Sequence, residues 1–220
     1  MQKRTVQAMK TFVMITLISF IATLIIYFPF IKDWISKGYV FSGVGDGFRQ
    51  MMPFQMYLYE HYTQLKGFYD HSFGLGGDYV KSLAYYYSLS PTMWCNFIMI
   101  WLGERLLHWN PHVIGFWPFN QLIVALGRSL LTFICAFYYF RYLKLKQAPL
   151  MIATILYGAS TVGLYYNFTW SFYGDLLIFL PLSLWGMERF FQRGKIGVFI
   201  VAIAITLFSN FYFSYYQAIV

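Results

Sequence analysis

Charged residues are scarce in this sequence. Asp, Glu, Lys and Arg make up only 11% of its 220 residues, whereas a soluble domain carries roughly 25%. Hydrophobic residues make up 59%, and the mean hydropathy is +0.53. The uncharged residues stand in runs of about 20, which is the length of a membrane-spanning helix. This shortage of charge excludes an ordinary soluble domain and predicts an all-α integral membrane protein, a polytopic helix bundle.

Cysteine is equally scarce. Cys95 and Cys135 have no metal-site spacing and are too few for a disulfide framework. We therefore expect two small apolar packing residues. A secretory cleavage pattern is also missing after the first apolar run. Because that run is too long for the hydrophobic region of a signal peptide, it is predicted to be an uncleaved first span.

The excess of positive charge does not indicate nucleic-acid binding. The formal net charge is +8, but most basic residues fall in three clusters, within residues 3–10, 141–146 and 189–195. The segment 32–111 has as many acidic as basic residues. Clusters at span ends are what the positive-inside rule predicts. We expect them to set the topology and, secondarily, to contact the headgroups of membrane lipids. No nucleic-acid partner is expected.

The apolar runs predict five membrane spans. Their expected positions are 11–31, 115–140, 148–166, 172–188 and 196–217. The basic tail places the N-terminus in the cytoplasm, and alternation then puts both later basic loops on the cytoplasmic side as well. The chain stops at Val220, within or just after the fifth span. We therefore expect the N-terminal portion of a larger architecture, or a naturally short protein.

The long segment between the first two spans, residues 32–114, is predicted to be extracytoplasmic. It holds all four histidines and six of the eight acidic residues. Segments this long inside a compact domain are usually functional. Apolar and aromatic residues at three- and four-residue steps predict an interfacial helix over about 48–62, with Asp46 as its N-cap.

A second helix is expected over about 91–107. Ser90 followed by Pro91 is a typical helix start. The helix is apolar enough to span the membrane, but a crossing here would put the basic cluster at 141–146 outside. Because that contradicts the positive-inside rule, we expect an interfacial or re-entrant helix at the outer face.

Several short motifs follow one another in a characteristic order. One span is followed by a long outer loop with an early Asp, two loop helices and then serial spans. The motifs are Gly45-Asp46-Gly47 with Gln50 and Pro53, Gly74 to Asp78, Tyr85-Tyr86 through Leu89-Ser90-Pro91, Leu180-Pro181-Leu182 before Gly186-Met187-Glu188, and Asn210-Phe211-Tyr212. In this order they resemble the YfhO-like bacterial membrane proteins. The order of features is similar to that of C-type glycosyltransferases, which use polyprenyl-phosphate sugars.

The resemblance implies transfer of a sugar from an undecaprenyl-phosphate carrier to a cell-envelope acceptor, such as teichoic or lipoteichoic acid. The implied place is the outer face of the bacterial plasma membrane. The implied partners are the polyprenyl-phosphate sugar donor and the cell-envelope polymer. A transporter or flippase of lipid-linked sugar, and a non-catalytic scaffold or fragment, are the alternatives. Both alternatives predict that the carboxylate of Asp46 is dispensable.

Asp46 is the candidate catalytic residue, because it matches the Asp that acts near the acceptor hydroxyl in such enzymes. In an inverting transfer that hydroxyl loses a proton as it attacks the anomeric carbon, and a carboxylate within about 3 Å is the natural base. The flanking Gly45 and Gly47 let backbone and substrate approach closely. The alternative is an ordinary Gly-Asp-Gly turn that caps a helix.

Three further residues are candidates for binding the substrate. Arg49 could pair with the carrier phosphate, because a guanidinium forks onto phosphate oxygens, or it could be an exposed loop arginine. Gln50 could hydrogen-bond a sugar or orient Asp46. Arg128 stands near the middle of the second span, where a charge costs at least about 2.5–3.5 kcal/mol. Arg128 could contact a phosphate or a charged loop residue. Alternatively, it could form a structural pair or snorkel toward the membrane surface.

Asp70, His71 and Asp78 flank a glycine-rich stretch and could form a metal site or a second acid–base set. Their spacing matches no specific metal pattern, and a role in a turn is the alternative. Asp78 is kept among the candidate substrate-binding residues. No cofactor is assigned. A divalent cation is left open, because a carrier with a single phosphate has less need of a metal than one with a diphosphate.

Overall fold

Helices make up most of the computed structural model, which describes residues 2–38 and 45–219. Residues 42–44 of the glycine-rich stretch and the side chains of Lys3 and Arg4 lie outside this description. The prediction of an all-α membrane protein is confirmed.

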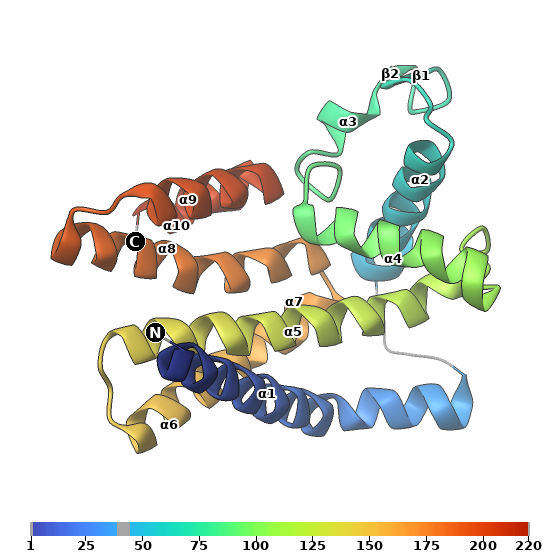
Figure 1. Ribbon diagram of the computed structural model, residues 1–220. Helices are drawn as coiled ribbons and strands as arrows, with labels where there is room; N and C mark the ends of the chain where they lie inside the picture. Colours follow the sequence, from blue (N-terminus) through green and yellow to red (C-terminus); the bar gives the residue numbers. More distant parts are fainter. Residues whose placement is uncertain (1, 39–44, 220) are drawn as a thin grey trace.

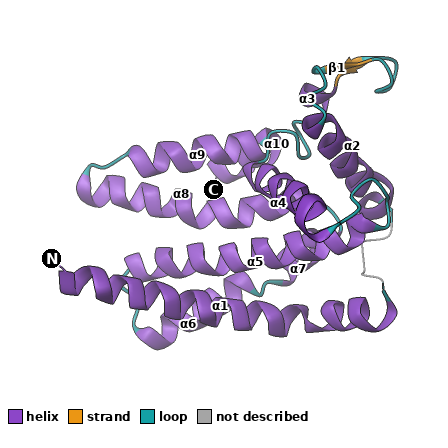
Figure 2. Cartoon of the chain, turned by 45° about the vertical axis from the view of Figure 1, so that its right-hand side comes forward, coloured by secondary structure: helices purple, strands orange, loops and turns teal. Residues whose placement is uncertain are grey.

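Helix α5 (Phe116–Tyr142) lies at the centre of the bundle. It contacts four other membrane-type helices, which are α1 (Gln2–Lys37), α6 (Gln147–Gly158), α7 (Thr161–Phe168) and α8 (Gly174–Arg193). Beyond α8 lie α9 (Gly197–Ser209) and α10 (Phe211–Ile219). One layer therefore holds α1, α5 and α6, and the other holds α8 and α9 (Figure 1, Figure 2).

Three helical stretches within the described part of the chain are long and apolar enough to cross a membrane. They are Phe12–Lys37, Phe116–Tyr142 and Gln147–Phe168, and they coincide with the first three expected spans. The fourth expected span corresponds to α8, which has Asp175 in its first turn and Arg193 in its last. The fifth corresponds to the shorter α9 and α10. The five-span arrangement and its orientation stay predictions.

Polar residues interrupt two of the expected spans. The third is divided between α6 and α7, where the Ser160 hydroxyl caps α7. The fifth is divided at Asn210, whose side-chain amide donates a hydrogen bond to the Tyr85 carbonyl at 2.7 Å. In contrast, α1 continues past its expected end at residue 31. An ion pair between Asp33 and Lys37, one turn apart at 2.9 Å, lies in this extension.

The residues between α1 and α5 that the structure describes, 45–115, are called the inter-span segment here. Its elements are the π-helix η1 (Gly47–Met51), α2 (Met52–Thr63), the antiparallel hairpin of β1 (Tyr69–Asp70) and β2 (Gly77–Asp78), α3 (Tyr79–Ser82) and α4 (Pro91–Leu107). The predicted helix over 91–107 is confirmed, with Ser90 as N-cap and Pro91 at its first position. The expected helix over 48–62 is present, but its first turn is a π-helix. Asp46 stands at the N-cap position, as predicted, but its side chain forms no capping hydrogen bond.

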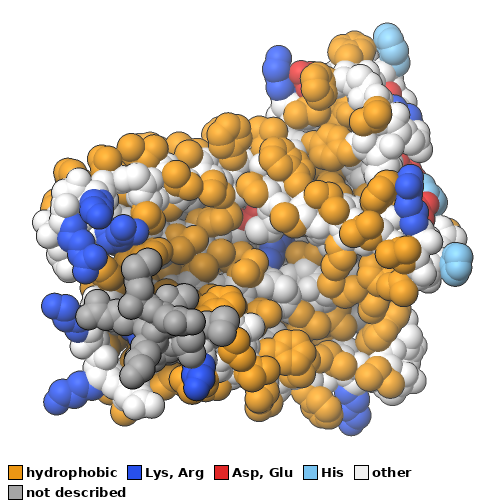
Figure 3. Space-filling view, in the orientation of Figure 1, with side chains coloured by type: hydrophobic (Ala, Val, Ile, Leu, Met, Phe, Trp, Pro, Cys, Tyr) orange, Lys and Arg blue, Asp and Glu red, His pale blue; other side chains and the backbone are white. Residues whose placement is uncertain are grey.

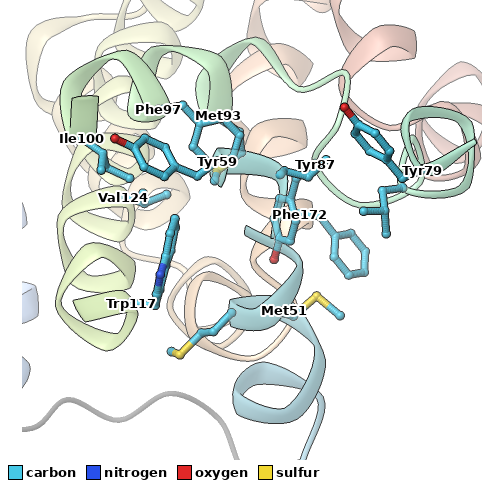
Figure 4. Close-up of a cluster of buried hydrophobic side chains, with 13 residues drawn as sticks. Met51, Tyr59, Tyr79, Tyr87, Met93, Phe97, Ile100, Trp117, Val124 and Phe172 are labelled. Carbon is cyan, nitrogen blue, oxygen red and sulfur yellow. The ribbon is translucent and has the colours of Figure 1, made fainter. Parts of the chain in front are cut away.

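An aromatic core joins the inter-span segment to α5 (Figure 4). Tyr59, Tyr79, Tyr87 and Trp117 are fully buried in it. The Trp117 ring meets the Tyr59 ring edge-on, with centroids 6.2 Å apart, and its indole N–H donates to the Pro111 carbonyl at 2.9 Å. Buried aromatic side chains contribute much of the packing energy of a core, and the O–H of Tyr and the N–H of Trp usually find a hydrogen-bond partner there. Helix α2 is therefore packed into the protein along one face, rather than lying only on an interface.

Hydrogen bonds between ionisable residues hold α2, α4 and the α4–α5 connection together. The Tyr59 hydroxyl donates to Glu104 at 2.6 Å, and His112 lies between Glu104 at 3.0 Å and Glu60 at 3.5 Å. The hydrogen bond from Tyr59 lowers the pKa of Glu104 from its ordinary value. Hydrogen bonds to Glu104 and Glu60 raise the pKa of His112. The folded cluster therefore favours charged Glu104 and charged His112.

The cluster predicts a pH dependence of local stability. Because the pKa of His112 is raised, its contribution is complete below about pH 6.5, the ordinary pKa of histidine, and is lost as pH rises through the folded value. Because the pKa of Glu104 is lowered, its contribution is complete above about pH 4.3 and is lost as pH falls. Hydrogen exchange of residues 104–116, corrected for intrinsic rates, should be slowest between these values. The variant His112→Gln should lose the rise in exchange above pH 6.5, and an unchanged rise in that variant would contradict the assignment.

Candidate active site

Asp46 lies at an exposed turn where the inter-span segment begins. Gly45 precedes it with φ of +89°, a conformation that favours glycine, and Gly47 after it is buried. The Gly45 carbonyl accepts a hydrogen bond from the Arg49 N–H at 2.8 Å. The carboxylate of Asp46 forms no capping hydrogen bond with the helix. It accepts a hydrogen bond from the indole N–H of Trp170 at 3.1 Å.

Trp170 belongs to a group of rings in the last turn of α7 and on the connection to α8. We call Tyr166, Trp170 and Tyr173 the aromatic platform. The Tyr166 ring stacks on that of Trp170 with centroids 5.9 Å apart, and its centroid lies 4.8 Å from that of Tyr173. These rings are partly exposed, so apolar ring faces and polar edges lie beside a carboxylate. Such a combination suits a ligand with both C–H and O–H groups on its surface.

Gln50 and Arg49 lie on the first turn after Asp46. The side-chain amide of Gln50 donates to the Tyr86 hydroxyl at 3.1 Å, and the Tyr86 ring meets Phe172, next to the platform, edge-on at 5.4 Å. Arg49 is exposed. Across the described part of the chain, no carboxylate lies within ion-pair distance of its guanidinium. The structure therefore brings Asp46, Arg49 and Gln50 together at one exposed rim.

Arg128 forms a buried ion pair with Asp175, in the first turn of α8. Its Nε lies 2.8 Å from the carboxylate, and the two side chains are only 2% and 1% exposed. The guanidinium also donates to the Ser171 carbonyl and, at 3.3 Å, to the Thr92 hydroxyl. The carboxylate accepts hydrogen bonds from Thr92 and, at 2.5 Å, from Ser90. Of the sequence alternatives for Arg128, structural pairing is the one that these contacts match.

The buried pair also fixes the loop that carries the platform. Ser171, whose carbonyl binds Arg128, directly follows Trp170. Its hydroxyl is held by the Tyr87 hydroxyl at 2.6 Å and by the Gln55 amide at 3.3 Å. Contacts thus run from the buried pair through Ser171 to Trp170 and on to the carboxylate of Asp46.

The structure does not bring Asp78 to Asp46. Asp78 lies beyond the far end of α2 (Figure 1), where its carboxylate caps α3 by accepting from the Lys81 N–H at 3.0 Å. Asp70 binds His61 at 2.9 Å and also accepts from Tyr57, and hydrogen bonds from Tyr57 and Ser72 lower its pKa. Among the residues described, no three His, Cys, Asp or Glu side chains form a cluster that could hold a metal ion.

An apolar cavity of about 420 Å³ lies beside the buried pair, between α4, α5, α8 and α9. Thr92, Asn96 and Arg128 supply its polar atoms, and the other lining residues are mainly apolar. A hollow between the layers, with a basic and an acidic side chain at its floor, is visible in Figure 3. The side-chain amide of Asn96 is buried without a hydrogen-bond partner.

Sequence reasoning missed the two contacts that organise this site. Asp175 was not among the candidate site residues. A signal for its pairing was available, because Arg128 and Asp175 are opposite charges in otherwise apolar spans. Trp170 was not among the candidate site residues either. The many aromatic residues between Tyr165 and Tyr173 were the available signal for a platform.

Comparison with known proteins gives a family and one curated relative. Residues 15–220 match the family described as bacterial membrane protein YfhO. Over 207 residues the chain is 30% identical to the "Uncharacterized protein YfhO" of Bacillus subtilis (strain 168). That match covers 94% of this chain and 24% of the relative, so the chain spans about a quarter of that relative's length. No solved structure matches.

The buried pair predicts an asymmetric response to substitution. Asp175→Asn should lower the free energy of unfolding by about 3–5 kcal/mol, because it leaves the Arg128 guanidinium buried without a counter-charge. The double variant Arg128→Met with Asp175→Leu should lose less than Asp175→Asn alone. Denaturant titration in detergent measures both. Asp33→Asn, which breaks the exposed pair with Lys37, should cost at most about 1 kcal/mol. Equal losses for Asp175→Asn and Asp33→Asn would contradict the assignment.

Proposed function

Because the chain belongs to the bacterial YfhO membrane protein family, we propose that it is the catalytic part of a C-type membrane glycosyltransferase. It moves a sugar from an undecaprenyl-phosphate carrier to a cell-envelope acceptor, such as teichoic or lipoteichoic acid, at the outer face of the plasma membrane. The observation that carries the proposal is the exposed carboxylate of Asp46, held by Trp170 beside the aromatic platform.

In the proposed reaction Asp46 acts as the general base. The acceptor hydroxyl gives its proton to the Asp46 carboxylate while its oxygen bonds to the anomeric carbon of the sugar. The bond between that carbon and the carrier phosphate breaks, and the polyprenyl phosphate leaves with the electron pair. The Trp170 N–H occupies one carboxylate oxygen, Oδ2. It thereby orients the carboxylate and leaves the second oxygen for the proton.

The neighbouring residues suit the other parts of the substrate. The aromatic platform offers ring faces to the sugar. Arg49, exposed and one turn beyond Asp46, is assigned to the carrier phosphate, because a guanidinium pairs with phosphate oxygens through two hydrogen bonds. Arg128 is already engaged by Asp175, Ser171 and Thr92. We therefore assign it to positioning the platform rather than to phosphate binding.

The apolar cavity supports a lipid-linked donor. Its volume of about 420 Å³ and its apolar lining between α4, α5, α8 and α9 suit a hydrocarbon chain. When an apolar ligand enters a pocket between membrane helices, it replaces lipid there, so no apolar surface becomes exposed to water. We assign the cavity to part of the polyprenyl chain.

Charge distribution supports placing Asp46 outside the cell. Lys and Arg side chains gather at the end of the bundle that holds the α5–α6 and α8–α9 loops, whereas His and acidic side chains gather at the opposite end (Figure 3). By the positive-inside rule the basic end faces the cytoplasm. The inter-span segment and Asp46 then face the cell envelope, where the proposed acceptor is found.

Transfer of labelled sugar from a polyprenyl-phosphate donor to envelope polymer tests the proposal. In membranes that carry the chain, Asp46→Asn should reduce transfer by roughly 10²–10⁴-fold, the usual contribution of a general base. Protein abundance must be matched between the membranes. Asp33→Asn removes an exposed carboxylate from the end of α1 and should leave transfer unchanged.

The outcomes separate the proposed enzyme from its alternatives. Equal transfer by wild type and Asp46→Asn would mean that Asp46 is a structural residue of the turn and not the general base. Absence of transfer by the wild type, together with movement of lipid-linked sugar across the membrane, would favour a flippase.

A further inference from the structure

We propose that the basic end of the bundle contains a binding site for the phosphate headgroup of an anionic phospholipid. The site is a cavity of about 340 Å³ between the last turns of α5 and α8. Its lining includes the cations Arg141, Lys144 and Arg193, and the polar side chains Tyr142, Trp185 and Gln192. This proposal is independent of the proposed glycosyltransferase reaction, because it uses the opposite end of the molecule.

The cations of this cavity are not neutralised by the protein. Among the residues described, no carboxylate lies within ion-pair distance of Arg141, Lys144 or Arg193. The acid on the neighbouring turn, Glu188, instead accepts a hydrogen bond from Gln192 at 3.0 Å. Three unpaired cations around one cavity create a local positive potential that attracts an anion.

Two hydrogen-bond donors in the cavity wall have no partner. The Tyr142 hydroxyl and the Trp185 indole nitrogen are buried, and neither forms a hydrogen bond. Buried polar groups are nearly always satisfied, so two such groups at one cavity need an explanation. An indole N–H can only donate. A phosphate diester, which can only accept, is complementary to it and to the surrounding cations.

The wall of the cavity joins two helices, and a cation lies over it. The Tyr142 and Trp185 rings meet edge-on with centroids 6.2 Å apart, which joins α5 to α8. Next to Trp185, Gly186 lets α9 approach so closely that a Cβ there would lie 2.5 Å from the Phe199 nitrogen. The Arg193 guanidinium lies over the Tyr142 ring at 5.6 Å.

Apolar side chains around the cavity favour a lipid over a free phosphate. Large apolar side chains that flank the two loops are exposed, and they are Leu143, Leu145, Phe190, Phe191 and Ile196. Exposed apolar side chains next to cations at a span end are typical of the membrane interface. There a headgroup phosphate is held beside the cavity by its acyl chains, and net negative charge distinguishes an anionic lipid from a zwitterionic one.

Native mass spectrometry of the purified full chain in neutral detergent, with added phosphatidylglycerol or phosphatidylcholine, tests the site. We expect phosphatidylglycerol to bind more tightly. Arg141→Gln with Arg193→Gln should weaken that binding roughly tenfold, since each cation near a membrane surface contributes to anionic-lipid affinity. The matched control is Lys146→Gln with Lys195→Gln, which removes two charges from the loops that follow α5 and α8, at positions outside the cavity lining. Its effect should be at most about threefold.

A conservative pair keeps the test valid if the arginine variants fail to fold. Tyr142→Phe with Trp185→Phe removes both unpartnered donors and keeps aromatic rings, so phosphatidylglycerol should bind roughly three- to tenfold more weakly at an unchanged thermal midpoint. Equal losses in the cavity and control pairs, or equal binding of the two lipids, would overturn the proposal and leave the cations as topology signals only. Displacement of phosphatidylglycerol by millimolar inorganic phosphate would also overturn it, because the site would then recognise free phosphate.

Discussion

The buried ion pair of Arg128 and Asp175 is the interaction on which the rest of the structure depends. Two charges removed from water carry a large desolvation cost, which only good geometry and further hydrogen bonds offset. Both are present here, because the Ser171 carbonyl and the Ser90 and Thr92 hydroxyls satisfy the pair. One pair therefore links α5, the start of α8 and the start of α4, which otherwise meet through apolar contacts that fix position less strictly.

The pair acts on the candidate site through the chain itself. Ser171 is bound by Arg128 and lies next to Trp170, and Trp170 holds the carboxylate of Asp46. An exposed turn at the beginning of the inter-span segment is thereby tied to the centre of the bundle. The same arrangement leaves two other features at separate places, an apolar cavity beside the pair and a cationic cavity at the basic end. These are the three places that we propose for sugar transfer at Asp46, for the polyprenyl chain in the apolar cavity and for an anionic lipid headgroup in the cationic cavity.

Local signals predicted local structure well. The helix over 91–107 was predicted with its observed bounds because the Ser90 cap and Pro91 are local determinants. The breaks at Ser160 and Asn210 were missed, because one polar residue hardly alters the hydropathy of a long apolar run. The first turn after Asp46 was predicted as an α-helix capped by the Asp46 carboxylate, whereas that turn is a π-helix and the carboxylate binds the distant Trp170 instead. Contacts such as that between Arg128 and Asp175 join distant residues, so no local pattern specifies them.

We infer that the buried pair positions the platform and, through it, Asp46. Hydrogen exchange of wild type and Asp175→Asn, compared well below the unfolding transition of the variant, shows whether the two distant segments depend on the pair. If the pair positions the platform, exchange in the variant should become faster not only in the first turn of α8 but also in residues 166–173 and 45–52. Faster exchange limited to residues 174–180, with the other two segments unchanged, would contradict it.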